Sequence, residues 1–187
     1  MTKVPYILAV AIVLILWGFV TLGSQEASSD GETVSPTVTD DGYKLVESVG
    51  MTFRWKVVDD ELDIILTSPA KGWLAVGFDP TQVMKDADIY IGFVGEEGNV
   101  SVRDDFATWF TSHEPDESLG GSSDVTVTGG SESAEGSRIH FRIPLDSGDE
   151  YDRVLTPGGE HEVMLAYGEN DDLGKRHRDR SKFTVEL

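Results

Sequence analysis

Short apolar runs that repeat at every second residue constrain the fold of most of this chain. Phe53, Trp55 and Val57 alternate with polar neighbours, and residues 62–66 repeat the pattern. Such alternation turns one face of a strand toward a core and the other toward water. Gly, Pro, Asp and Ser separate the runs, and no segment carries a sustained helical stripe, so we expect an all-β, antiparallel sandwich or barrel. Further strands are expected at residues 72–78, 88–94, 99–103, 124–128, 138–143, 161–167 and 182–187.

The N-terminal segment follows a different pattern. Residues 4–22 contain no charged side chain, and this length matches the roughly 20 residues with which a helix crosses a bilayer. Lys3 precedes the run and Glu26 and Asp30 follow it, which favours a cytoplasmic N-terminus. We therefore predict that residues 1–23 are a single-pass anchor in the cell membrane with the rest of the chain extracytoplasmic. The alternative is a cleaved signal peptide and a secreted protein, but its apolar core would be shorter, about 7–15 residues.

Composition divides the remainder into a linker and one domain. Residues 24–42 are rich in Ser, Thr, Asp and Glu and lack aromatic residues, so they cannot bury enough apolar surface to offset the entropy lost on ordering. We expect a flexible linker there and a single β-domain over residues 43–187. The formal net charge of −19 makes nucleic acid an improbable partner. The absence of Cys excludes disulfides, thiolate metal sites and covalently attached haem.

Several motifs recur in an order that resembles the DOMON domain, closest to its single-domain prokaryotic members. They are GWLAVGF at 72–78, Met84, ADIYIG at 87–92, DFAT at 105–108, FRIPL at 141–145, LAYG at 165–168 and His177. The resemblance implies an immunoglobulin-like β-sandwich that binds haem b or a sugar. In the cytochrome members a Met and a His ligate the iron, and the corresponding residues here are Met84 and His177. With both axial positions filled, such a domain transfers single electrons and is not an enzyme. Its partner would be a redox protein or a membrane electron-transfer chain.

The residues themselves support this assignment to different degrees. Met84 lies in a polar connection, where a core role is less natural than for a Met within a strand. His177 lies among Arg176, Arg178 and Arg180 in an otherwise acidic chain, which suggests an anionic partner such as the haem propionates. Neighbouring cations would also keep the imidazole neutral. The alternative is a basic edge that prevents aggregation between strands.

Other residues offer a second class of function. Trp109 and Phe110 lie in polar surroundings, so they could stack on a sugar, wall a haem crevice or pack under a loop. Asn99 begins an N-glycosylation sequence. The quartet His113, Glu114, Asp116 and Glu117 could hold a divalent cation, but acidic loops are usually just solvated, and we predict no metal besides haem iron. His161 is expected at the surface. No familiar hydrolase, nucleotide or zinc motif is present in the sequence.

Overall fold

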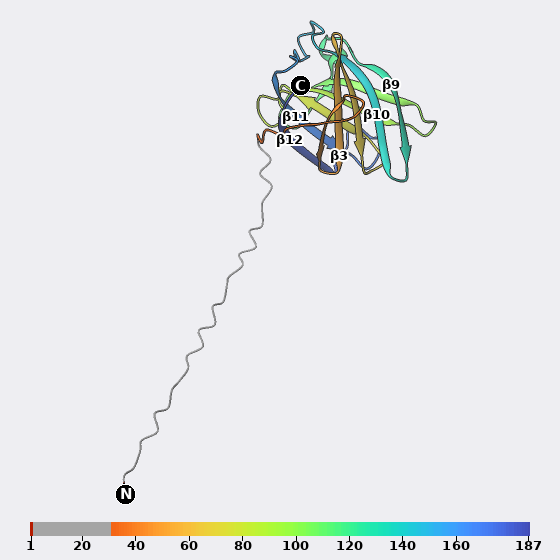
Figure 1. Cartoon of the computed structure of the whole chain (residues 1–187). Coiled ribbons are helices and arrows are strands. Elements are labelled where there is room, and N and C mark those ends of the chain that lie inside the picture. The colour runs from red at the N-terminus through yellow and green to blue at the C-terminus, as the bar shows by residue number, and fades with distance from the viewer. Residues whose placement is uncertain (2–30) are drawn as a thin grey trace.

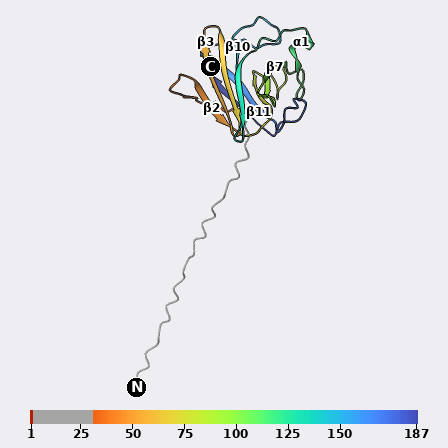
Figure 2. The same cartoon turned by 90° about the vertical axis from the view of Figure 1, so that its right-hand side faces the viewer.

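The computed structural model describes Met1 and residues 31–187, which form two facing antiparallel sheets of six strands each. The predicted anchor and the first part of the predicted linker lie outside the described residues. Figure 1 shows the strands wrapped around one core, and Figure 2 separates β2 and β3 on one side from β7 and α1 on the other. Of the two folds that the sequence predicted, sandwich and barrel, the structure has the sandwich.

The first sheet has the strand order β1-β2-β3-β4-β10-β9. Its strands are β1 (Thr37–Val38), β2 (Lys44–Ser48), β3 (Met51–Val58), β4 (Glu61–Ser68), β9 (Thr126–Ser133) and β10 (Gly136–Pro144). β3 and β4 form a hairpin in register Trp55↔Ile64, and β10 pairs with β4 in register Phe141↔Ile64. The apolar residues of the three central strands therefore lie side by side on one face.

The second sheet has the order β12-β11-β5-β6-β7-β8. Its strands are β5 (Leu74–Phe78), β6 (Asp88–Val94), β7 (Val100–Phe106), β8 (Glu114–Pro115), β11 (Glu160–Tyr167) and β12 (Asp179–Glu186). α1 (Asp116–Leu119) is a single turn that follows β8. Among the described residues, no helix has the length and hydropathy needed to cross a bilayer.

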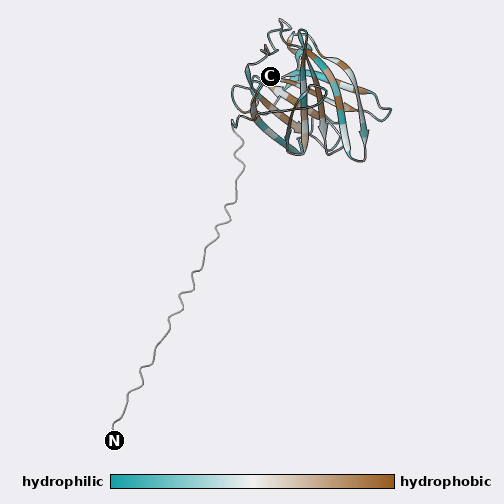
Figure 3. Ribbon diagram, in the orientation of Figure 1, coloured by the Kyte–Doolittle hydropathy of each residue, from teal (hydrophilic) through white to brown (hydrophobic). Residues whose placement is uncertain are grey.

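Alternation along the strands builds the core between the sheets, and Figure 3 shows apolar and polar residues in turn along several strands. Trp55 and Phe53 are fully buried and stack with ring centroids 4.5 Å apart. Phe78 of the second sheet meets Phe53 edge to face at 6.3 Å, a geometry that adds to the hydrophobic gain from burial. Tyr90 and Phe141 extend this aromatic contact across the sandwich at 5.9 Å.

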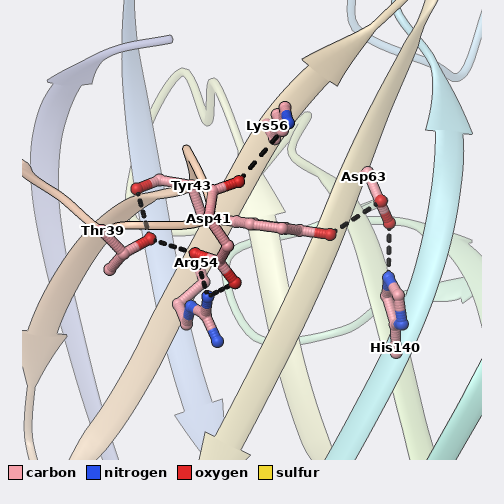
Figure 4. Close-up of polar contacts among 7 residues, drawn as sticks. All are labelled: Thr39, Asp41, Tyr43, Arg54, Lys56, Asp63 and His140. Atoms are coloured by element: carbon pink, nitrogen blue, oxygen red, sulfur yellow. Dashed lines mark hydrogen bonds and ion pairs between the residues drawn. The ribbon is translucent and has the colours of Figure 1, made fainter.

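The outward face of the first sheet is polar and bonded. Figure 4 shows the Tyr43 hydroxyl donating to Asp63 Oδ2 at 2.9 Å, with His140 Nε2 lying 2.5 Å from Asp63 Oδ1. Arg54 donates to both oxygens of Asp41 at 2.9 and 2.7 Å. These contacts join β3, β4 and β10 to the segment before β2.

The aromatic core generates a stability prediction. Replacing Trp55 by Ala should lower the free energy of unfolding by about 3–5 kcal/mol, because a fully buried ring leaves a cavity between the sheets. Trp109, whose exposed fraction is 57%, is the matched control, and its replacement by Ala should change stability by about 0.5 kcal/mol or less. Urea denaturation of the full-length chain measures both. Equal losses for the two variants would contradict the proposed core.

Candidate functional site

The outward face of the second sheet carries a second apolar cluster. Leu74, Val76 and Phe78 of β5 face the main core, so Ala75 and Gly77 face outward. We call the residues gathered there the outer cluster: Trp73, Ala75, Ala87, Ile89, Ile91 and Ala107, with the partly buried Met84, Phe93, Met164, Ala166 and Leu173. An outward sheet face is normally polar in an antiparallel sandwich. This one is apolar, and its six central residues are already buried, with exposed fractions of 0–7%.

Residues with small side chains occupy the middle of the outer cluster. Ala75 pairs with Ala166, and Gly77 pairs with Met164, across the β5–β11 contact. A Cβ added to Gly77 would lie 2.9 Å from Met164 Cε and 3.2 Å from Ile89 Cγ1. The larger side chains of Met164 and Ile89 thus close around a position that has no side chain of its own.

Trp73 lies at one end of the outer cluster. Its ring lies against Gly168, where an added Cβ would be 2.2 Å from Trp73 Nε1. The indole is 5% exposed, and its Nε1 is buried without a hydrogen-bond partner. A buried indole N–H normally finds an acceptor, so the cluster contains one donor that the protein itself leaves unpaired.

Loops from opposite ends of the sheet reach the outer cluster. Phe78 pairs with Val163, whereas Leu74 pairs with Tyr167. Residues 79–87 therefore leave one end of the sheet and residues 168–178 the other. Met84 of the first loop and Leu173 of the second both pack against the cluster.

The loop that carries Met84 is fixed at both ends. Asp79 accepts from the Glu162 backbone N–H at 2.9 Å and lies 2.7 Å from His161 Nδ1. At the other end, the Asp86 N–H donates to the Ala107 carbonyl at 2.8 Å. His161 is only 6% exposed, so the expectation that it lies at the surface was wrong. Its side chain is held inside because it bonds the first residue of this loop.

His177 lies in a different hollow. It lines a space of about 630 Å³ together with Ser48, Val49 and residues 178–181, a volume within the usual range of about 300–1,000 Å³ for small-molecule sites. The structure therefore brings His177, Arg178 and Arg180 together, while Met84 lies in the outer cluster. Leu173, four residues before His177, connects this loop to the outer cluster.

The charges around His177 favour its neutral form. Burial lowers the pKa of the imidazole below its usual value, and the nearby Arg180 and Arg176 lower it further. Arg178 forms an exposed ion pair with Glu169 at 3.2 Å, a type of contact worth about 0–1 kcal/mol. Within residues 31–187, Arg176 and Arg180 take part in no ion pair. Both guanidinium groups are thus available to an anion.

The remaining predicted site residues lie apart from these two regions. Trp109 is 57% exposed, and its ring centroid lies 4.7 Å from that of the half-buried Phe110 in the loop before β8. Asn99 is exposed in the turn between β6 and β7. His113 lies 2.5 Å from Asp105 on β7, whereas Asp116 is buried, so the expected quartet is not a single cluster.

Sequence reasoning missed the outer cluster, although a signal was present. Residues 74–78 are apolar or Gly at every position, without the polar alternation of β3. A short continuous apolar run indicates a strand covered on both faces. The strand at residues 72–78 was predicted, but the burial of its outward face was not.

Comparison with known proteins places this geometry in a family. The family model of the DOMON domain matches residues 47–168. The chain belongs to the DOMON family. No curated protein matches it in sequence.

Among solved structures, this DOMON domain is similar to the cytochrome domain of Myriococcum thermophilum cellobiose dehydrogenase, with a TM-score of 0.61 and 14% identity over 81% of this chain and 88% of that one. It is also similar to the cytochrome b domain of Coprinopsis cinerea pyranose dehydrogenase, with a TM-score of 0.55 and 14% identity over 76% and 80% of the two chains. A family 9 carbohydrate-binding module from Caldicellulosiruptor kristjanssonii, in complex with cellotriose, has a TM-score of 0.45 and 11% identity over 83% and 93%. At these identities, the likeness concerns the fold.

The electrostatics of His177 can be tested directly. Replacing Arg180 by Gln should raise the pKa of His177 toward its usual value of 6.5, because removing a neighbouring positive charge makes protonation easier. The pKa is measured from the imidazole proton shifts in an NMR titration of the full-length chain. Arg138→Gln, on β10 of the other sheet, is the control and should leave the His177 titration unchanged. An unaltered pKa in Arg180→Gln would show that the loop is not arranged as described.

Proposed function

We propose that this DOMON domain binds haem b and transfers single electrons. The observation that carries the proposal is the apolar outer cluster, which Met84 contacts directly and which the loop bearing His177 contacts through Leu173. A macrocycle needs such a surface, because most of its area is apolar and would be taken out of water. Two structural neighbours are cytochrome domains, which supports the proposal at the level of the fold.

Met84 and His177 are the proposed axial ligands. Met84 already packs against the outer cluster, and its loop is fixed at both ends. His177 is held neutral by burial and by its basic neighbours, so its ring nitrogen keeps a free lone pair. Haem supplies one-electron redox chemistry when bound. With a thioether and an imidazole filling both axial positions, no position remains for oxygen or substrate, and we infer an electron-transfer role without catalysis.

The basic residues around His177 are proposed to hold the haem propionates. Arg176 and Arg180 have no ion-pair partner among the described residues, and the exposed Arg178–Glu169 pair is weak enough to exchange. Arg is suited to carboxylates because its planar fork donates two parallel hydrogen bonds. We therefore expect Arg176, Arg178 and Arg180 to bind the propionate edge of the haem.

The setting of the domain is also part of the proposal. We infer that residues 1–23 anchor the chain in the cell membrane, that residues 24–42 link the anchor to the domain, and that residues 43–187 work outside the cytoplasm as a single-domain, prokaryotic-type member. Signal cleavage, with secretion, is the competing outcome. A strongly acidic surface would attract a basic redox protein and repel nucleic acid.

The ligand set is tested by haem titration of the detergent-solubilised full-length chain. We expect reduced wild-type protein to show a sharp low-spin b-type spectrum. Met84→Leu and His177→Gln should each convert it to a high-spin spectrum or lose the haem, because one axial ligand is missing. The matched controls carry the same substitutions elsewhere: Met51→Leu in the main core and His140→Gln on the first sheet.

Three outcomes separate the possibilities. Low-spin haem in both controls but not in Met84→Leu or His177→Gln supports the ligand pair. If low-spin haem persists in one of the two test variants, the residue replaced in that variant is not an axial ligand, and another residue fills its position. A wild-type spectrum identical to that of free haemin would contradict haem binding itself.

A carbohydrate-binding function is the alternative, and the exposure of Trp109 is the observation that favours it. An exposed indole beside a second ring offers a face for stacking on a sugar. Affinity electrophoresis on soluble polysaccharides would then show retardation of the wild-type chain. We expect Trp109→Ala to abolish it, whereas Val154→Ala, another exposed apolar residue, should not. Equal migration of all three proteins with and without polysaccharide would exclude this use of Trp109.

A further inference from the structure

Four aspartates converge at one end of the sandwich, on the inner side of the second sheet. Asp88 begins β6, Asp104 lies on β7, Asp116 is the first residue of α1, and Asp152 belongs to the connection between β10 and β11. The first three are each only 1% exposed, and Asp152 is half-buried. Asp104 pairs with Tyr90, a residue of the main core, so these carboxylates face the space between the sheets. We call these residues the aspartate cluster.

The carboxylate oxygens are close enough to share one ion. One oxygen each from Asp88, Asp104 and Asp152 lies within 4.8 Å of the other two. Calcium binds oxygen at about 2.3–2.6 Å, so two oxygens on opposite sides of the ion are separated by about twice that distance. The three oxygens are therefore close enough to bind one calcium-sized ion together.

Each of these three carboxylates is held by one oxygen and leaves the other free. Oδ2 accepts from a protein donor in every case: the Arg153 N–H at 3.1 Å for Asp88, the Asp124 N–H at 3.0 Å for Asp104, and the Ser147 hydroxyl for Asp152. Oδ1 of each is buried and has no hydrogen-bond partner among the described residues, and the same holds for both oxygens of Asp116. Such groups are rare because an unpaired buried acceptor loses its hydration without compensation. Asp88, Asp104 and Asp152 thus each have one oxygen available to a cation.

No protein cation neutralises the cluster. In the described part of the chain, none of the ion pairs includes Asp88, Asp104, Asp116 or Asp152. Burial raises the pKa of Asp104 to about 8 and that of Asp116 to about 7, and repulsion from neighbouring aspartates adds to both.

We propose that the aspartate cluster binds a divalent cation of the calcium class. The ligands are all carboxylate oxygens, which suit hard cations such as Ca²⁺ and not the nitrogen- and sulfur-seeking Zn²⁺ or Cu²⁺. This differs from the sequence expectation of no metal besides haem iron. Of the quartet considered there, only Asp116 belongs to the site, because His113 is bonded to Asp105 on the outward face of β7.

Stability and luminescence test the proposal on the full-length chain after treatment with EDTA. Ca²⁺ at about a hundredfold excess over its dissociation constant should raise Tm by about 5–10 °C. Tb³⁺, a luminescent ion of similar coordination, should emit on excitation of tyrosine, because the Tyr90 hydroxyl lies 3.3 Å from Asp88 Oδ2. Added Ca²⁺ should displace Tb³⁺ and quench this emission.

Two neighbouring residues of α1 provide a matched pair. Asp116→Asn should weaken Ca²⁺ binding by about tenfold or more, because the affinity of such sites follows the charge of the ligands. The same charge change at the exposed Glu117, made as Glu117→Gln, should leave it unchanged. Asp104→Asn should also lose the Ca²⁺ response while remaining at least as stable as the wild type in EDTA, since it removes a buried charge.

The result that overturns the proposal is a wild-type chain whose Tm does not respond to Ca²⁺ and that gives no sensitised Tb³⁺ emission. A loss of affinity in Glu117→Gln equal to that in Asp116→Asn would overturn it as well, because surface charge would then account for binding. Neither readout depends on haem or on Met84 and His177.

Discussion

Packing of the aromatic rings between the two sheets is the constraint on which the rest of the structure depends. Trp55, Phe53 and Phe78 fill the middle of the sandwich and determine which face of each strand points inward. Because side chains alternate along a strand, fixing the inner face also fixes the outer one. The outer cluster and the polar contacts around Asp63 lie on the outer faces that result when the inner face of each sheet is fixed.

The two outer faces then differ for a simple reason. β3 and β10 alternate apolar and polar residues, so their outward positions carry Arg54 and His140, which bond to carboxylates. β5 and β6 are apolar on both faces, so their outward positions must be covered by loops or by a ligand. A strand with two apolar faces costs solubility unless something packs on it, and here loop residues such as Met84 and Leu173 pack on the outward face.

The sequence predicted the strands better than it predicted the sites. Alternation located β3, β4 and β10 correctly, but it missed β2, whose one buried residue is Val46, and the two-residue β1 and β8. The loop position of Met84 was also predicted. The burial of Asp88 and Asp104 was not, because among 34 acidic residues nothing local marks those that the closing loops cover. Asp104 and Asp105 are neighbours on β7, yet they face opposite sides of the sheet, and only the complete fold separates them.

The position of Asp88 has one more consequence. It follows the loop of Met84 directly, and Arg153, next to Asp152, donates a side-chain hydrogen bond to the Asp86 carbonyl in that loop. A cation on the aspartates would therefore restrict the segment that presents the thioether. Thermodynamic linkage makes such an effect mutual. An ion that raised the affinity for a cofactor would itself bind more tightly when the cofactor is present. If the domain binds haem as proposed, the calcium concentration outside the cell would therefore influence how tightly the Met84 loop holds it.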